Sequence, residues 1–134
     1  ATMTEGMSYM GPPLDHAVSA FLEDTRSRGL DEKIMLVATG EMGRTPKINA
    51  KGGRDHWGGI TPLLLSGGGI NTGQVIGQST KDGGRPASSP FGNSHLIATI
   101  LHTLLDVGEL RTVTGLPSDV SQILSRYQPI NGLH

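Results

Sequence analysis

The chain has 134 residues, a formal net charge of −1 and no cysteine. These values favour a single domain over residues 1–134, and they exclude both a disulfide framework and a thiolate metal site. No apolar run approaches the roughly 20 residues that span a bilayer, and no basic run typical of nucleic-acid binding stands out in the sequence.

The first regular element is predicted over residues 12–29, after a flexible segment at residues 1–10. Leu14, Val18, Phe21 and Leu22 recur with the period of a helix and form one apolar stripe. The two prolines at the start of this segment suit a helix entry, and the glycine at its end suits a helix stop. The segment is therefore predicted to be an amphipathic helix.

Two apolar runs follow, "KIMLVAT" at residues 33–39 and "ITPLLLS" at residues 60–66. Continuous apolar runs of this length are typical of strands that are buried on both faces. A helix, a short turn and a buried strand in succession predict an α/β fold with a mostly parallel sheet and flanking helices. A short strand at residues 74–77 is expected to follow in a hairpin.

The last part of the chain is predicted to be helical in two places. The segment "HLIATILHTLLDVG", residues 95–108, has apolar residues at helical spacing and a plausible N-cap in Ser94. A shorter helix is predicted within residues 117–127.

A glycine-rich loop at residues 40–59 connects the two predicted strands. In open α/β sheets, ligands bind at the carboxyl ends of the strands, so this loop is the first place to look for a site. Glu41, Asp55 and His56 offer the oxygen and imidazole ligands of a divalent metal such as zinc, manganese or magnesium. The alternative is that Glu41 is a solvated turn residue and that the Asp-His pair is a chance neighbourhood.

The same loop carries groups that suit an anionic ester. The guanidinium groups of Arg44 and Arg54 fit phosphate or sulfate oxygens, and Thr45 adds a hydroxyl. Trp57 is expected either to form a wall of the substrate pocket or to fill a gap over the core. Arg44 could instead pair with a nearby carboxylate. The loop as a whole predicts a metal-dependent hydrolase that acts on small phosphate or sulfate esters.

Two other functions fit the sequence. One is a small serine esterase that uses Ser94 or Ser66, because "GNSHL" is close to the nucleophile elbow G-x-S-x-G. The other is a non-catalytic remnant that binds an anion or a partner through the glycine-rich loop.

The motifs "GEMGRTP" and "GRDHW", followed by "LLLSGGGINTGQVIG", resemble the C-terminal part of a bacterial family of proteins of unknown function. This is the domain-of-unknown-function group numbered 1501, which is abundant in planctomycetes. The similarity covers nearly the whole chain after about Met10 and includes "NSHLIATILHTLLDVGEL".

The resemblance implies membership of the alkaline phosphatase and sulfatase superfamily, whose enzymes are metal-dependent hydrolases with an α/β core. It implies a metal-ligand role for Glu41 and His56, with Asp55 as their neighbour. The Asp-His pair of the superfamily motif is absent here, because Met42 follows Glu41.

The superfamily nucleophile belongs to an N-terminal half that this sequence does not contain. The resemblance therefore implies a piece of a larger, exported or periplasmic hydrolase that is incomplete on its own. It also implies a homo-oligomer, formed through a sheet edge that the missing strands leave exposed.

Overall fold

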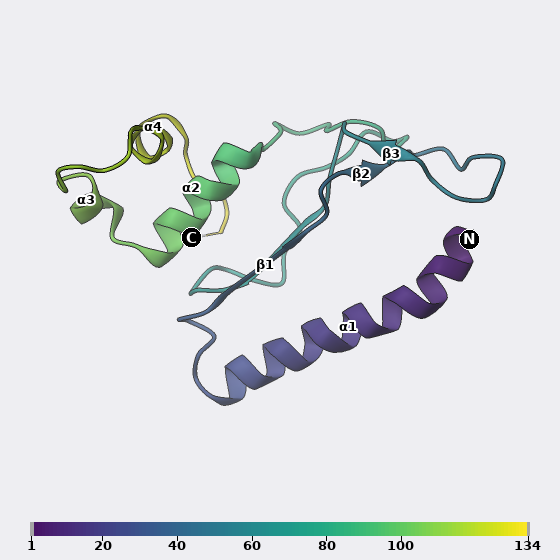
Figure 1. The fold of residues 1–134 in the computed structure, drawn as a ribbon, viewed down its shortest axis with the longest axis horizontal. Helices are drawn as coiled ribbons and strands as arrows, with labels where there is room; N and C mark the ends of the chain where they lie inside the picture. The colour runs from purple at the N-terminus through teal and green to yellow at the C-terminus, as the bar shows by residue number, and fades with distance from the viewer. Residues whose placement is uncertain (1, 134) are drawn as a thin grey trace.

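The computed structural model describes residues 2–133. Its helices are α1 (Met3–Ser27), α2 (Asn93–Leu104), α3 (Val107–Leu110) and α4 (Ser118–Arg126). Its strands are β1 (Met35–Thr39), β2 (Gly43–Arg44), β3 (His56–Trp57) and β4 (Leu63–Gly67). Figure 1 shows α1 extending beside the strands, while the other helices gather around the C-terminus.

Helix α1 begins at Met3, so the predicted start at the prolines is wrong. Thr2 and Glu5 form a capping box: the Glu5 amide donates to Thr2 Oγ1 at 3.2 Å, and the Thr2 amide donates to Glu5 Oε2 at 2.6 Å. Pro12 and Pro13 lie inside the helix, where each removes one backbone hydrogen bond. The helix ends as predicted, because Gly29 adopts a φ of 61° that favours glycine.

The predicted parallel sheet is wrong. β1 pairs with β4 in an antiparallel ladder that places Val37 opposite Leu65, and β2 pairs antiparallel with β3. Parallel strands need a crossover connection, usually a helix, but the chain between β1 and β4 folds back on itself as the β2–β3 hairpin. The α/β class is therefore replaced by four helices and two small antiparallel ladders within residues 2–133.

The strands are also less buried than their sequence indicates. Val37 in β1 is 37% exposed, and Leu63 and Leu64 in β4 are 38% and 41% exposed. A continuous apolar run predicts burial on both faces, but the described residues cover these strands only in part.

Residues 74–77 form no strand, so the predicted hairpin is also wrong. Val75 is 95% exposed, and the Gln74 side chain donates to the Asn71 and Gly132 carbonyls. These bonds tie the segment to the C-terminal tail rather than to a neighbouring strand.

The core lies where this tail meets the β1–β4 ladder. Ile70, Ile130 and Leu133 are buried together, with Met35 and Leu65 packed against them. The fully buried Thr99 connects α2 to the tail, because its hydroxyl accepts from the Ile130 amide at 2.9 Å.

The two predicted C-terminal helices are present with shifted bounds. α2 begins after Gly92 rather than Ser94, and it ends before Asp106, whose side chain caps the separate helix α3. Within the described part of the chain, no helix combines the length and the apolar character that crossing a bilayer requires.

Candidate functional site

The glycine-rich loop is an ordered hairpin. β2 and β3 place Gly43 opposite Trp57 and Arg44 opposite His56. A Cβ atom at position 43 would overlap the carbonyl of Ile60, so only glycine allows the chain just after β3 to approach β2 this closely. Two residues on each strand therefore fix the base of a longer loop, residues 45–55.

This loop is held by its own polar side chains. Thr45 Oγ1 accepts from the Asp55 amide at 3.1 Å, and Asn49 Nδ2 donates to Asp55 Oδ1 at 2.9 Å. Asn49 Oδ1 accepts in turn from the amides of Lys51 and Gly53. Asp55 and Thr45 thus order the loop, a structural role beside the ligand roles predicted for them.

The hairpin concentrates positive charge. Residues 44–56 carry four Lys or Arg side chains against one carboxylate, a formal net charge of +3 in a chain whose total is −1. In the described part of the chain, the ion pair present joins Arg28 to Asp24, so Asp55 forms none with a hairpin cation. We call residues 44–56 the basic hairpin; its cations are Arg44, Lys47, Lys51 and Arg54.

The predicted substrate-binding arginines are both on this hairpin and both exposed. Arg54 Nη1 donates to the Thr45 carbonyl at 3.2 Å, which holds its guanidinium over the loop and leaves other N–H groups for a ligand. Arg44 lies on the opposite strand, directly across from His56. The predicted pairing of Arg44 with Asp55 or Glu41 is not among the ion pairs of residues 2–133.

Trp57 anchors the hairpin to another loop. Its indole Nε1 donates to the Gly84 carbonyl at 2.7 Å, and Gly84 is buried. Gly84 belongs to a turn in which Asp82 accepts from the Thr80 hydroxyl at 2.6 Å and from the Gly84 amide at 3.1 Å. These two hydrogen bonds, the one from Thr80 first, lower the pKa of Asp82.

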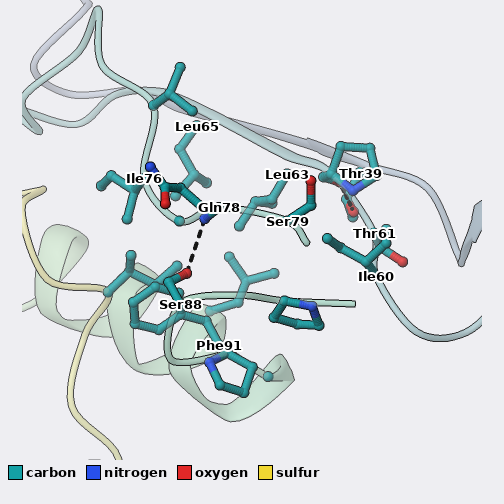
Figure 2. Close-up of a pocket in the computed structure, with 18 of the residues that line it drawn as sticks. Thr39, Ile60, Thr61, Leu63, Leu65, Ile76, Gln78, Ser79, Ser88 and Phe91 are labelled. Carbon is teal, nitrogen blue, oxygen red and sulfur yellow. Dashed lines mark hydrogen bonds between the residues drawn. The ribbon is translucent and has the colours of Figure 1, made fainter. Parts of the chain in front are cut away.

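A separate groove of about 800 Å³ lies beside the β1–β4 ladder. Figure 2 shows hydroxyl, amide and apolar side chains around it. The backbone N–H of Gln78 donates to Ser88 Oγ at 3.0 Å. Glu41 is the one charged residue among those that line it. A groove with a single carboxylate and no cation disfavours an anionic ligand.

The predicted metal ligands are divided between these two places. Glu41 lines the groove, whereas Asp55 and His56 belong to the hairpin and are not among the groove-lining residues. Within residues 2–133, no three His, Asp or Glu side chains gather closely enough to hold a metal ion. The donors described here do not by themselves fit a metal centre.

The predicted serine nucleophiles lie in unlike settings. Ser66 is inside β4, and Ser94 is in the first turn of α2 instead of at a strand-to-helix elbow. His95, next to Ser94, accepts from the Gly92 amide through Nδ1 at 3.1 Å, and its ring contacts Phe91 and Tyr127 edge-on. His95 therefore caps α2 and packs against its neighbours, a role that the sequence analysis did not identify.

The clustered charge of the basic hairpin was also not predicted from the sequence. Its cations are spaced along the chain, and only the pairing of β2 with β3 brings the outer two together. The glycines and the asparagine between them were the available signal for a tight loop.

A family described as "Protein of unknown function (DUF1501)" matches residues 1–122 of the chain. No curated protein and no solved structure matches it.

Proposed function

For this chain, which belongs to the DUF1501 family, we propose a role in recognising the anionic group of phosphate or sulfate esters through the basic hairpin. The observation that carries the proposal is the set of four cations in residues 44–56, where the one carboxylate accepts from Asn49 and pairs with none of them. Unneutralised guanidinium groups on an ordered loop are suited to bind an oxyanion with charge-assisted hydrogen bonds.

Arg44 and Arg54 are the main ligands in this proposal. They occupy opposite sides of the hairpin, one in β2 and the other two residues before β3. Thr45, the residue after Arg44, ties the two sides of the hairpin together, since its carbonyl accepts from the Arg54 side chain and its hydroxyl accepts from the Asp55 amide. The loop is therefore ordered before the ligand arrives, which lowers the entropic cost of binding.

The chain contains a convenient reporter for this binding. Trp57 is the only tryptophan in the sequence. It pairs with Gly43, the residue that precedes Arg44 in β2. We expect inorganic phosphate and methyl phosphate to change its fluorescence in a saturable way. Arg44→Gln or Arg54→Gln should raise the Kd about tenfold, the value of one charge-assisted hydrogen bond.

The matched control is Arg126→Gln, the same chemical change in the last turn of α4. It should leave the Kd unchanged. Equal losses in all three variants would mean that net charge, and not the hairpin, governs binding, and the proposal would be wrong.

A metal-dependent phosphate or sulfate ester hydrolase is the second candidate. It is favoured by the position of Glu41, which lines the groove just after β1, because a metal ion held by this carboxylate would offset the charge that otherwise disfavours an anionic ester there. Because no three of the described donors gather, zinc, manganese or magnesium bound here would complete its coordination with water or with ligands from outside residues 2–133.

This candidate predicts that one of these metals raises the Tm and that His56→Ala abolishes the rise. Lys51→Ala, on the same loop, is the control and should keep the rise. Failure of all three metals to change the Tm would exclude metal binding by this chain alone, and it would leave the anion-binding proposal intact.

A further inference from the structure

Helix α1 carries an apolar seam with the spacing of a coiled coil. Its members alternate by four and three residues along the helix, so they share one face. The large side chains among them are strongly exposed: Met7 is 61%, Met10 64% and Leu14 64% exposed. The seam consists of Met3, Met7, Met10, Leu14, Ala17 and Phe21.

The rest of the described chain does not cover this seam. The extensive packing between elements joins β1 to β4, α2 to α4 and β2 to β3, and α1 takes no part in it. The backbone hydrogen bonds that join α1 to neighbouring loops lie at its ends: the Met3 amide donates to the carbonyl of the distant Gly52, and the amide of Leu30, in the turn just after the helix, donates to the Thr25 carbonyl. A contiguous exposed apolar stripe of this kind marks an interaction surface.

The total surface shows that the chain leaves much of its area uncovered. The accessible area is 9632 Å², whereas a folded monomer of this size exposes about 6,700 Å². The surplus of about 2,900 Å² exceeds the roughly 800 Å² that each partner contributes to an interface of standard size. The uncovered area of the whole chain therefore exceeds what one standard interface needs, and the exposed side chains of the seam are part of it.

The geometry points to a second copy of this chain as the occupant, and we propose that two α1 helices pair antiparallel through the seam. In an antiparallel alignment centred between Met10 and Leu14, every seam residue of one helix lies opposite a seam residue of the other. The resulting layers are Met10 with Leu14, Met7 with Ala17, and Met3 with Phe21.

The charges on α1 also suit this pairing. The positions that flank the seam hold Thr, Gly, Val, Pro, Ala and Ser, so two identical helices meet without repulsion between like charges. Acidic residues lie toward the other end: Glu23 and Asp24 would approach the N-terminus of the partner helix, where the helix dipole favours negative charge.

The test is the mass in solution, measured by light scattering and sedimentation from micromolar to millimolar concentration. We expect a dimer. Leu14→Asp should raise the dissociation constant about 1,000-fold, because a symmetric dimer carries the buried charge twice. Tyr9→Asp is the matched control, since Tyr9 is a similarly exposed large side chain, at 60%, that lies off the seam.

Orientation is tested with cysteine variants, because the native chain has no cysteine. Met10→Cys mixed with Leu14→Cys should form a crosslink under mild oxidation, and each variant alone should link poorly. Efficient linking of each variant to itself would indicate parallel helices and would overturn the antiparallel arrangement.

Three results would overturn the self-association itself: a wild-type monomer at all concentrations, a dimer that Leu14→Asp leaves intact, or equal weakening by Tyr9→Asp. Circular dichroism distinguishes loss of pairing from loss of folding. Since α1 packs little against the rest of the chain, Leu14→Asp should keep the native helical signal of α2 and α4.

Discussion

At the scale of single residues, the hairpin depends on side chains that were predicted to bind ligands and that also hold the structure. Trp57 is the clearest case, because its indole N–H donates to the carbonyl of the buried Gly84 and so joins the hairpin to another loop. The turn that presents Gly84 is fixed by Asp82, whose carboxylate accepts from Thr80 and from the Gly84 amide. The hydrogen bonds around Asp82 are therefore part of what positions the candidate site.

These bonds give a prediction about pH. Hydrogen bonding by Thr80, and then by the Gly84 amide, lowers the pKa of Asp82 below its ordinary value. The folded state then binds fewer protons than the unfolded state, so the stabilisation is complete above the ordinary aspartate pKa. It is lost as the pH falls through the lowered pKa of the folded state.

We expect Thr80→Val to raise the pKa of Asp82 toward its ordinary value, as measured by the carboxyl carbon shift in an NMR titration. Thr112→Val is the control, because its hydroxyl donates to a backbone carbonyl far from Asp82. An Asp82 pKa that stays lowered in Thr80→Val would show that the hydroxyl is not its main cause.

At the scale of elements, the close approach of Ile60 to the β2–β3 hairpin depends on Gly43. A methyl group at this position would overlap the Ile60 carbonyl, so the strand must move or the loop must open. Gly43→Ala should reduce the free energy of unfolding by about 1–3 kcal/mol, the usual cost of overpacking. Urea denaturation measures this change.

Gly58→Ala is a suitable control for that experiment. It lies in the same connection, but a Cβ there would meet nothing within 4 Å. Its effect should be within about 0.5 kcal/mol, as for an ordinary surface substitution. If both variants unfolded at the same urea concentration, close packing at Gly43 would not be what shapes the hairpin.

Among the elements, sequence patterns identified helices and strands better than their boundaries and partners. The apolar runs at residues 33–39 and 60–66 are strands, and the helical periods near residues 95 and 117 are helices. The start of α1 was wrong because Thr2 and Glu5 were not recognised as a capping box. The pairing direction was wrong because an apolar run reports burial but carries no information about which strand lies beside it.

At the scale of the whole molecule, the sequence indicated where a site would lie and did not determine how its residues converge. The connection between β1 and β4 does hold the candidate residues, yet it separates Glu41 from His56 and Asp55. Convergence depends on tertiary placement, which local spacing does not specify. The exposure of the α1 seam could not be predicted from the sequence either, because periodicity predicts an apolar face without showing what covers it.

The most direct test of the central claim is an amide NMR titration of the protein with sulfate and with methyl phosphate. We expect saturable shift changes concentrated in residues 44–56, which a variant carrying both Arg44→Gln and Arg54→Gln no longer shows. Shift changes that centre instead on the groove around Glu41, or that persist in the doubly substituted protein, would contradict it.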